Sequence, residues 1–272
     1  MTDLALPGPF WLIGCGNMAG AMLRGWLDAG MNPAGVTVIR PSGRPVAEGV
    51  RVLTQLPADE RPVVAMLGVK PQKLDEVAPG LAPALDGSAL LISILAGVEY
   101  ASLRTRFRGP RTIVRAMPNT PTELRKGATS LYAEGGEGED SALAERLMAA
   151  LGRVEWIEDE TLFDVVAALT ASGPAFVFRF IDALASAAAA LGLAEEQARR
   201  LALATVEGAG ALAAASEETP HRLAERVASP GGMTRKGLNI LDSDQSLERL
   251  VSATLEAAVR RSREMGEEAR HK

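Results

Sequence analysis

Two glycine-rich segments near opposite ends of the chain carry the residue types and spacing best suited to chemistry. The first is Gly14-Cys15-Gly16-Asn17-Met18-Ala19, and the second is Ser229-Pro230-Gly231-Gly232-Met233-Thr234. Glycine turns that lead into helices present free backbone N–H groups at the positive end of the helix dipole, and such groups bind anions. The first segment therefore predicts a site for the phosphates of a dinucleotide. The second predicts a site for a small anion, with an ordinary helix-entry turn as the alternative.

The surroundings of the first segment favour a nucleotide site over a chance match in a glycine-rich chain. An apolar run at residues 10–13 precedes it and a stretch with helical spacing follows it, which predicts a strand, a tight turn and a helix. Gly14 then permits the turn, Gly16 lets the backbone approach a pyrophosphate, and Ala19 keeps the helix close to the strand. The predicted cofactor-binding residues of this loop are Gly14, Gly16, Asn17, Met18 and Ala19.

The end of the second predicted strand indicates which dinucleotide is bound. NAD-binding proteins place an acidic residue about 20 positions beyond the glycine loop, where it holds the ribose 2′-hydroxyl. Here the turn after Ile39 contains Arg40, Ser42 and Arg44 and no carboxylate. Because arginine pairs with phosphate oxygens, these residues predict a site for the 2′-phosphate and a preference for NADPH, with NADH still possible. The alternative is that both arginines merely solvate an exposed turn.

Composition and charge narrow the class of protein. The chain has 272 residues, 47% hydrophobic and 23% charged, with a net charge of -5 and no basic block, so we expect no nucleic-acid partner. A single cysteine, Cys15, and an N-terminus without a signal-peptide pattern predict a cytoplasmic protein. The apolar stretch from Val165 to Leu193 is interrupted by Arg179 and Asp182, so we expect a buried helix and no membrane partner.

Acid–base and metal chemistry have few candidates in this chain. The two histidines, His221 and His271, lie in a charged helical segment and in the tail, so we expect no metal site and no histidine-centred catalysis. Cys15 lies against the predicted cofactor loop, where we expect a packing residue and not a nucleophile.

Periodicity predicts two domains. Short apolar runs that read as strands alternate with helical stretches such as 72–85 and 141–151, which favours a parallel, doubly wound sheet. These runs are 10–13, 36–39, 63–67, 89–95, 111–117, 129–133 and 154–157. Strand signals stop near Glu160. We therefore predict a Rossmann domain at 1–160 and an all-α domain at 161–272, with helices beginning after Ser172, near Glu195 and near Ser246, and with a frayed tail from Arg260.

The helical region is too rich in alanine and leucine to cover its own apolar surface. Helices with apolar residues on several faces are normally buried, so a second copy of the chain is the expected cover, and a self-sufficient bundle packed on the sheet is the alternative. We expect a homodimer or a higher homo-oligomer built from dimers.

Six motifs together resemble the pyrroline-5-carboxylate reductase family, in order and spacing, over nearly the whole chain. They are the first glycine loop, Val69-Lys70-Pro71, Ala96-Gly97-Val98, Arg115-x-Met117-Pro118-Asn119-Thr120-Pro121, Ser172-Gly173-Pro174-Ala175-Phe176 and Ser229-Pro230-Gly231-Gly232-x-Thr234. The resemblance implies an N-terminal Rossmann domain, a helical dimerisation domain, and reduction of the cyclic imine 1-pyrroline-5-carboxylate to L-proline with a nicotinamide cofactor. This reaction is the last step of proline biosynthesis.

The resemblance also implies roles for particular residues. On the substrate side, the backbone of Gly231, Gly232, Met233 and Thr234 would hold the carboxylate, with Ser229 beside it and the Thr234 hydroxyl near the ring nitrogen as the catalytic group. On the cofactor side, Val69, Lys70, Pro71, Ala96 and Gly97 would line the nicotinamide and its ribose, and Asn119 would lie at the mouth between domains. An exposed loop lysine and an Asx-type turn are the plain alternatives for Lys70 and Asn119.

The chain departs from the family's usual residues at a few positions. Met233 stands where a smaller residue is usual, Ala171 where glycine is usual, and Gly68 where alanine is usual, and Arg235-Lys236 add two charges after Thr234. Two other functions remain open. One is a related hydroxyacid or ketopantoate-type dehydrogenase, which generally needs a lysine or histidine acid in its second domain. The other is a non-catalytic NADP-binding regulator.

Overall fold

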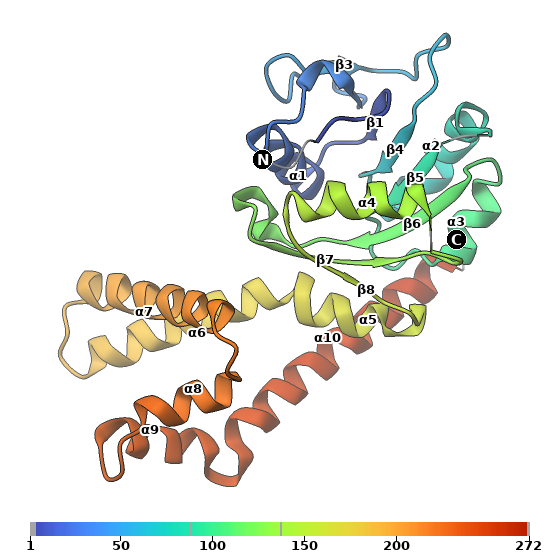
Figure 1. Cartoon of the computed structure of the whole chain (residues 1–272). Coiled ribbons are helices and arrows are strands. Elements are labelled where there is room, and N and C mark those ends of the chain that lie inside the picture. Colours follow the sequence, from blue (N-terminus) through green and yellow to red (C-terminus); the bar gives the residue numbers. More distant parts are fainter. Residues whose placement is uncertain (1–3, 88, 137, 271–272) are drawn as a thin grey trace. The chain divides into compact units, whose positions relative to one another are not determined.

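The computed structural model describes residues 4–87, 89–136 and 138–270, which form two compact units. One unit combines residues 1–172 with 258–272 and contains the sheet, and the other consists of residues 173–257 and is helical. Figure 1 shows the strands in the blue to green part of the chain and the helices alone in the yellow to red part. The predicted class, a Rossmann-like α/β sheet followed by a helical dimerisation domain, is confirmed.

The described residues form one eight-stranded sheet in the order β3-β2-β1-β4-β5-β6-β7-β8. The strands are β1 Phe10–Ile13, β2 Val36–Ile39, β3 Arg51–Leu53, β4 Val64–Leu67, β5 Leu90–Ser93, β6 Thr112–Met117, β7 Gly127–Tyr132 and β8 Gly152–Trp156. All seven expected strands are present. The sequence missed β3, a three-residue edge strand that starts with the exposed Arg51 and therefore has no apolar run.

The expectation of an all-parallel sheet was wrong at one pair. Strands β6 and β7 are antiparallel, whereas the remaining pairs are parallel. Parallel strands need a crossover of a dozen or more residues, and the connection between Met117 and Gly127 contains only a 3₁₀ turn at Thr120–Leu124. The chain therefore reverses at this point, and the helix α4 (Glu139–Ala149) provides a parallel crossover between β7 and β8.

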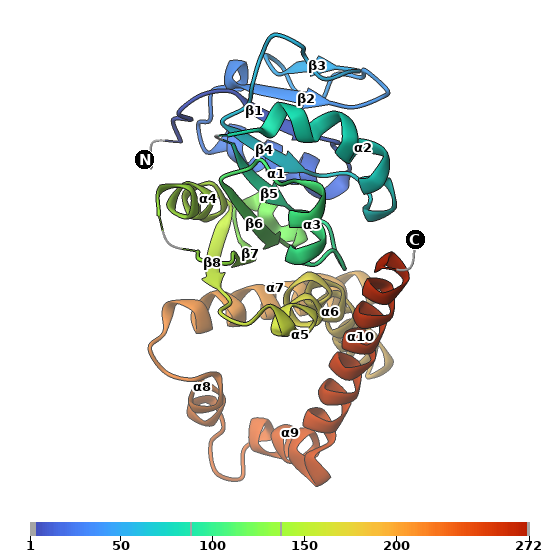
Figure 2. The same ribbon diagram turned by 90° about the vertical axis from the view of Figure 1, so that its right-hand side faces the viewer.

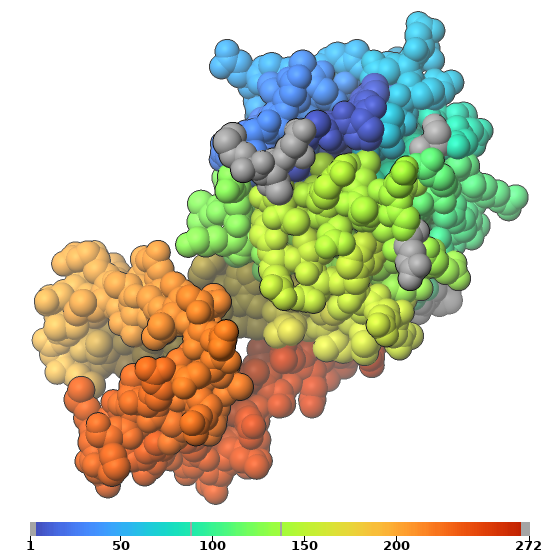
Figure 3. All heavy atoms as spheres, in the orientation of Figure 1, coloured from blue at the N-terminus to red at the C-terminus, as the bar shows by residue number. Residues whose placement is uncertain are grey.

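Helices cover both faces of the sheet and bury its central strands. The helices of this unit are α1 Asn17–Asp28, α2 Leu74–Leu81, α3 Tyr100–Arg106, α4 Glu139–Ala149 and α5 Phe163–Val166. Apolar residues of α1 and α4 pack on one face, and those of α2 and α3 pack on the other (Figure 2). The Trp26 indole on α1 donates a hydrogen bond of 2.6 Å to the Leu147 carbonyl on α4. In Figure 3 the atoms of the α4 region cover the middle of the face that is turned to the viewer.

Three helices of the second unit begin where the sequence predicted. This unit contains α6 Gly173–Ala190, α7 Glu195–Ala215, α8 Pro220–Val227, α9 Met233–Asp242 and most of α10 Ser246–Arg270. Helix α6 starts directly after Ser172, and α7 and α10 start at Glu195 and Ser246 as expected. A π-helical turn at Ala167–Ala171 joins α5 to α6.

The expected burial of the apolar stretch was wrong for the single chain. The buried core between α6 and α7 consists of the small residues Ala185, Ala198 and Ala202, with the larger Ile181 and Leu193 only partly buried against it. Phe178 is 64% exposed and Leu212 is 61% exposed. By length and composition alone, the continuous helical segment Glu160–Ala190 is apolar enough to cross a membrane. The helical unit therefore leaves a large apolar surface that its own helices do not cover.

The C-terminal tail was also predicted wrongly as far as Arg270. Helix α10 continues through it, and residues 258–272 belong to the sheet unit, where Gly266 is buried. The compact units also divide after residue 172, because α5 packs on the sheet unit through Phe163, which is 3% exposed. The assignment of 161–272 as the substrate-binding and dimerisation domain stays a prediction.

An ion pair between Arg111 and Asp140, at the start of α4, makes the stability of the sheet unit depend on pH. Arg111 donates hydrogen bonds of 2.7 and 2.5 Å to the Asp140 carboxylate, and the Thr112 hydroxyl donates a third of 2.8 Å. The guanidinium of Arg111 lowers the pKa of Asp140, and the Thr112 hydrogen bond acts in the same direction. A lowered pKa stabilises the fold above the ordinary carboxyl value of about 3.9, and this contribution is lost as pH falls through the folded-state pKa.

We expect Asp140→Asn to lower the free energy of unfolding by about 2 kcal/mol at pH 7, since it removes charge-assisted hydrogen bonds from a buried group. The difference from the parent should shrink as pH falls from 7 towards 3. Urea unfolding at fixed protein concentration measures it, with Glu139→Gln on the neighbouring exposed position as the control. An equal difference at all pH values would contradict the role of the charge.

Candidate active site

The first glycine loop lies at the carboxyl end of β1, beside the point where the strand order reverses between β1 and β4. Gly14 has φ of +83°, and its N–H donates to the Ile39 carbonyl at 2.8 Å. A Cβ at this position would lie 2.8 Å from Val69 Cγ1 and 3.0 Å from the Gly68 backbone. Both the backbone conformation and the space therefore require glycine at position 14.

Gly16 differs from Gly14 because its surroundings are open. It is the residue before α1, no side chain caps the helix there, and a Cβ would meet no atom within 4 Å. The first N–H groups of α1 consequently have no side-chain partner at this end and are available to an anion. Ala19 packs inward, and a Cβ on Gly68 would lie 2.8 Å from its Cβ, which explains the glycine at position 68.

A cavity of about 760 Å³ lies over this loop. The loop residues Cys15 to Met18 line it, together with Arg40 from the end of β2 and Arg24 from α1. Arg24 donates to the Glu123 carboxylate at 2.9 Å, and sequence analysis missed both residues because neither belongs to a motif. Burial raises the pKa of the Cys15 thiol, although Arg40 and Arg24 oppose the rise. A thiol of this kind is a packing residue and not an activated nucleophile.

The structure separates the three predicted phosphate-binding residues at the end of β2. Arg40 is partly buried and lines the cavity, whereas Ser42 and Arg44 lie in the exposed turn beyond it and do not line it. Within that turn the Arg44 N–H approaches the Ser42 hydroxyl at 3.4 Å, next to Gly43 with φ of +60°. Arg40 is therefore the predicted phosphate ligand with the strongest structural support.

The other predicted cofactor residues follow neighbouring strands at the same edge of the sheet. Val69, Lys70 and Pro71 follow β4, and Ala96 and Gly97 follow β5. Pro71 and Gly97 meet at a small pocket of about 30 Å³, while Lys70 and Ala96 are exposed. Because ligands of such sheets bind outside the carboxyl ends of the strands, this edge is the expected place for a dinucleotide.

Asn119 has a structural role, and it differs from the Asx-type turn that the sequence offered as the alternative. Its amide nitrogen donates to the Thr170 carbonyl at 3.0 Å, and its amide oxygen accepts from the Ala128 N–H at 2.8 Å. The side chain is 7% exposed. Asn119 thus ties the turn after β6 to β7 and to the π-helical turn, and its part in cofactor binding stays a prediction.

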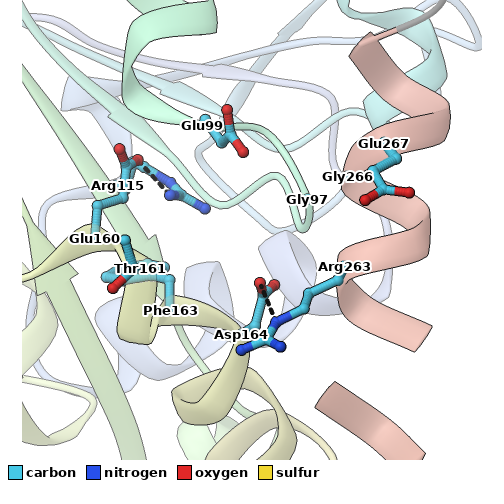
Figure 4. A pocket seen from close by; sticks show the side chains of 10 residues that line it. All are labelled: Gly97, Glu99, Arg115, Glu160, Thr161, Phe163, Asp164, Arg263, Gly266 and Glu267. Carbon is cyan, nitrogen blue, oxygen red and sulfur yellow. Dashed lines mark hydrogen bonds and ion pairs between the residues drawn. The ribbon is translucent and has the colours of Figure 1, made fainter. Parts of the chain in front are cut away.

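A second cavity, of about 550 Å³, lies beside Gly97 in the sheet unit (Figure 4). The buried Arg115 of β6 pairs with Glu160 there, and its guanidinium lies 4.4 Å above the ring of Phe163. Asp164 of α5 accepts a hydrogen bond of 2.6 Å from the Ser262 hydroxyl of α10. In the sequence, Arg115 is the one feature that could have indicated this cavity, because a charged residue is unusual inside an apolar strand such as β6.

The second glycine segment forms a turn into a helix in the helical unit. Gly231 has φ of +73°, Gly232 precedes α9, and no side chain caps that helix. The Gly232 N–H donates back to the Ser229 carbonyl at 3.0 Å. Thr234 lies in the first turn of α9, and Met233 is 91% exposed. This geometry fits an anion at the N–H groups of Met233 and Thr234.

The sheet unit satisfies the requirements of a nicotinamide dinucleotide site. Its strand order, its glycine loop with an open Gly16, and the cationic Arg40 all fit such a cofactor. Among residues 4–87, 89–136 and 138–270, no three His, Cys, Asp or Glu side chains lie close enough to hold a metal ion. Fold and site together define an NADP-dependent oxidoreductase with a helical second domain.

Comparison with known proteins supports this class and narrows it. Residues 160–265 match the family model for pyrroline-5-carboxylate reductase dimerisation, and residues 10–97 match that for NADP oxidoreductase, coenzyme F420-dependent. The pyrroline-5-carboxylate reductase of Pseudomonas aeruginosa is 37% identical over 263 residues, which cover 94% of this chain and 96% of the relative. The chain belongs to the pyrroline-5-carboxylate reductase family.

Solved structures agree with this assignment. A pyrroline-5-carboxylate reductase from Coxiella burnetii has a TM-score of 0.87 and 34% identity, covering 96% of this chain and 99% of that one. The Plasmodium falciparum pyrroline carboxylate reductase with NADP bound has a TM-score of 0.83 and 27% identity, covering 96% and 98%.

These comparisons confirm several expectations at the level of the family. They confirm the predicted family, the oxidoreductase activity that reduces 1-pyrroline-5-carboxylate to proline, and the use of an NADP cofactor. The dimerisation model also supports a homo-oligomer that acts on a small molecule.

Proposed function

We propose that this chain reduces 1-pyrroline-5-carboxylate to L-proline with NADPH, as the last step of proline biosynthesis. One observation carries the proposal: the open glycine loop and Arg40 form a dinucleotide site in a chain that is similar to such reductases over 94% of its length. The intact second glycine turn, with two glycines before α9, supports catalysis over a purely regulatory role.

On the cofactor side, the glycine loop holds the pyrophosphate and Arg40 holds the 2′-phosphate, with Ser42 and Arg44 contributing from the exposed turn. Val69, Lys70, Pro71, Ala96 and Gly97 line the nicotinamide and its ribose, and Asn119 supports this edge of the sheet. The support for these roles is their common position after the carboxyl ends of β1, β2, β4, β5 and β6.

On the substrate side, the turn before α9 holds the carboxylate of the imine. The backbone N–H groups of Met233 and Thr234 supply the donors, Gly231 and Gly232 give the turn its shape, and Ser229 lies beside them. Gly231 has the positive φ that such a turn needs, and a second glycine allows the close approach of an anion. The exposed Met233 side chain bears on which substrates are accepted.

The reaction depends more on the positioning of the substrate than on a strong acid or base from the protein. The bound dinucleotide supplies a hydride, and a protonated C=N carbon is already electrophilic. The protein's task is to hold the ring at one end through its carboxylate, so that the imine carbon reaches a near-attack distance of roughly 3 to 3.5 Å. The Thr234 hydroxyl orients the ring nitrogen and assists its protonation. The alternative that it caps the helix lacks support, because Gly232 is the N-cap of α9 and no side chain caps it.

The proposed assembly is a homo-oligomer built from dimers, in the cytoplasm. The exposed apolar residues of α6 and α7 and the match to a dimerisation model support the dimer. Size-exclusion chromatography with light scattering measures the mass, and a monomer at micromolar concentration would contradict this part of the proposal.

One assay separates this function from its two alternatives. The purified protein is mixed with NADPH and pyrroline-5-carboxylate, and the absorbance of the reduced nicotinamide is followed. Oxidation with the imine and not with keto acids supports the proposal. The reverse pattern supports a hydroxyacid or ketopantoate-type dehydrogenase, and binding of NADPH without oxidation by either substrate supports a regulator.

Cofactor preference is tested by Arg40→Asp. We expect kcat/KM for NADPH to fall by about tenfold, about 1.4 kcal/mol, because a carboxylate replaces the partner of the 2′-phosphate, while the value for NADH is retained. Arg61→Asp, at an exposed position away from the cavity, is the matched control. Equal use of the two cofactors by the parent protein would refute the preference.

A further inference from the structure

The loop that follows β5 contacts the end of the last helix in the chain. Gly97 has φ of +73°, and a Cβ on it would lie 3.4 Å from the Gly266 nitrogen and 3.6 Å from the Gly266 Cα. Gly266 lies inside α10 and is buried, and a Cβ on it would lie 3.7 Å from the Gly97 carbonyl oxygen. The backbone of the helix therefore rests directly on the backbone of the loop, which Figure 4 shows at its right side.

A glycine inside a helix is destabilising by about 1 kcal/mol relative to alanine, so its presence needs a reason. At Gly266 the two backbones lie close together, which excludes a branched side chain and still leaves room for the Cβ of alanine. An alanine at 266 would make an ordinary van der Waals contact, whereas a branched side chain would add atoms beyond a Cβ that already touches the loop.

A hydrogen bond fixes the end of α10 near this contact. The Ser262 hydroxyl donates to Asp164 Oδ1 at 2.6 Å, and Arg263 Nε lies 3.8 Å from Asp164 Oδ2. Asp164 belongs to α5, which is anchored on the sheet unit through its buried neighbour Phe163. The position of Gly266 is thus set by α5 as well as by its own helix.

The C-terminal end of this loop is fixed by Glu160, which lies in the turn that leads into α5. The N–H of Tyr100, the first residue of α3, donates to Glu160 Oε1 at 2.6 Å, and the same carboxylate pairs with the buried Arg115. Residues 96–99 therefore follow the buried Leu95, are fixed at the start of α3 by the Glu160 carboxylate, and contact Gly266 between these two points. Ala96 remains exposed at the turn of the loop.

We propose that Gly266, held by the Asp164–Ser262 hydrogen bond, is a positioning residue that sets the place of the Ala96–Gly97 loop under the nicotinamide. The inference rests on the proposed function, in which this loop lines the nicotinamide. All of its contacts lie within the sheet unit, which contains both the loop and residues 258–272. Small displacements of positioning groups have large effects on binding and turnover, so the end of α10 belongs to the cofactor site.

Two substitutions at one position test the proposal. Gly266→Val should raise the Kd of NADPH at least fivefold, because its added atoms push the loop, whereas Gly266→Ala should stay within twofold of the parent. The Kd is measured by titrating the fluorescence of NADPH, which needs no substrate. The KM for NADPH should follow the Kd, and the KM for the imine should stay within twofold.

A second pair keeps the test decisive if Gly266→Val does not fold. Asp164→Ala removes the acceptor of the Ser262 hydrogen bond and should raise the Kd of NADPH about threefold, whereas Asp164→Asn keeps an oxygen acceptor and should restore it. Thermal unfolding and chromatography confirm that each variant is folded and assembled like the parent.

The outcomes separate this inference from the proposed function. Parental NADPH affinity in folded Gly266→Val and Asp164→Ala would overturn it, and so would equal losses in Gly266→Ala and Gly266→Val. If the parent binds NADPH and does not reduce the imine, the proposed function fails, while the series of Kd values still decides the role of Gly266.

Discussion

The Gly16→Val variant is expected to bind NADPH at least about a hundredfold more weakly than the parent, a loss of about 2.8 kcal/mol. Position 16 has extended backbone angles, φ −84° and ψ −163°, that valine adopts readily, and no atom lies within 4 Å of its Cβ direction. The fold should therefore accept the change. The open space over the loop is what a pyrophosphate needs, and a valine side chain would fill it.

Direct titration of NADPH fluorescence measures this loss, and thermal unfolding checks that the protein remains folded. Gly80→Val is the matched control, because Gly80 is exposed on α2 and a Cβ there meets only Leu56 at 3.9 Å. Gly14→Ala should behave differently from Gly16→Val and lose stability as well as binding, since a Cβ at 14 has no room. Parental affinity in a folded Gly16→Val protein would remove the glycine loop from the cofactor site.

The Thr234→Ala variant is expected to lower kcat by ten- to a hundredfold, about 1.4 to 2.8 kcal/mol, with a much smaller change in the KM for NADPH. Its hydroxyl is the proposed hydrogen-bonding partner of the ring nitrogen, while its backbone N–H, which holds the carboxylate, survives the substitution. Thr234→Ser retains the hydroxyl and should recover most of the activity.

Steady-state kinetics with both substrates varied measures this effect. Thr205→Ala is the matched control, because the Thr205 hydroxyl only donates to the Leu201 carbonyl within its own helix. Unchanged kcat in a folded Thr234→Ala variant would show that the hydroxyl takes no part in the reaction.

The strands were largely predictable because each of the buried strands is a short run of residues that are contiguous in sequence. Residues 10–13 are apolar at every position and residues 36–39 at every position but Thr37, as expected for strands buried on both faces, and all such runs became strands. Strand β3 escaped prediction because an edge strand needs no apolar run. The reversal at β6–β7 depended on what a short connection permits, which periodicity does not reveal.

The candidate site was predictable only in part. The residues that were predicted act within one turn, whereas those that were missed depend on contacts between distant segments. Gly14, Gly16 and Arg40 act through the backbone or charge of one turn, so a motif identifies them. Asn119 was placed in the right turn, yet its side chain bonds to Thr170 and Ala128, partners far along the sequence. Arg24 and Glu123 line the cavity only because α1 and the turn after β6 pack together.

The sequence by itself determined the family, the glycine loops and the order of strands and helices, because each depends on residue types at short spacing. Only the tertiary structure decided that the charged tail is a helix whose Gly266 lies on Gly97, that Arg44 stays outside the cavity that Arg40 enters, and that Arg115 pairs with Glu160. These facts join residues distant in the chain, and such pairings are set by how the elements pack and not by the pattern within any one of them.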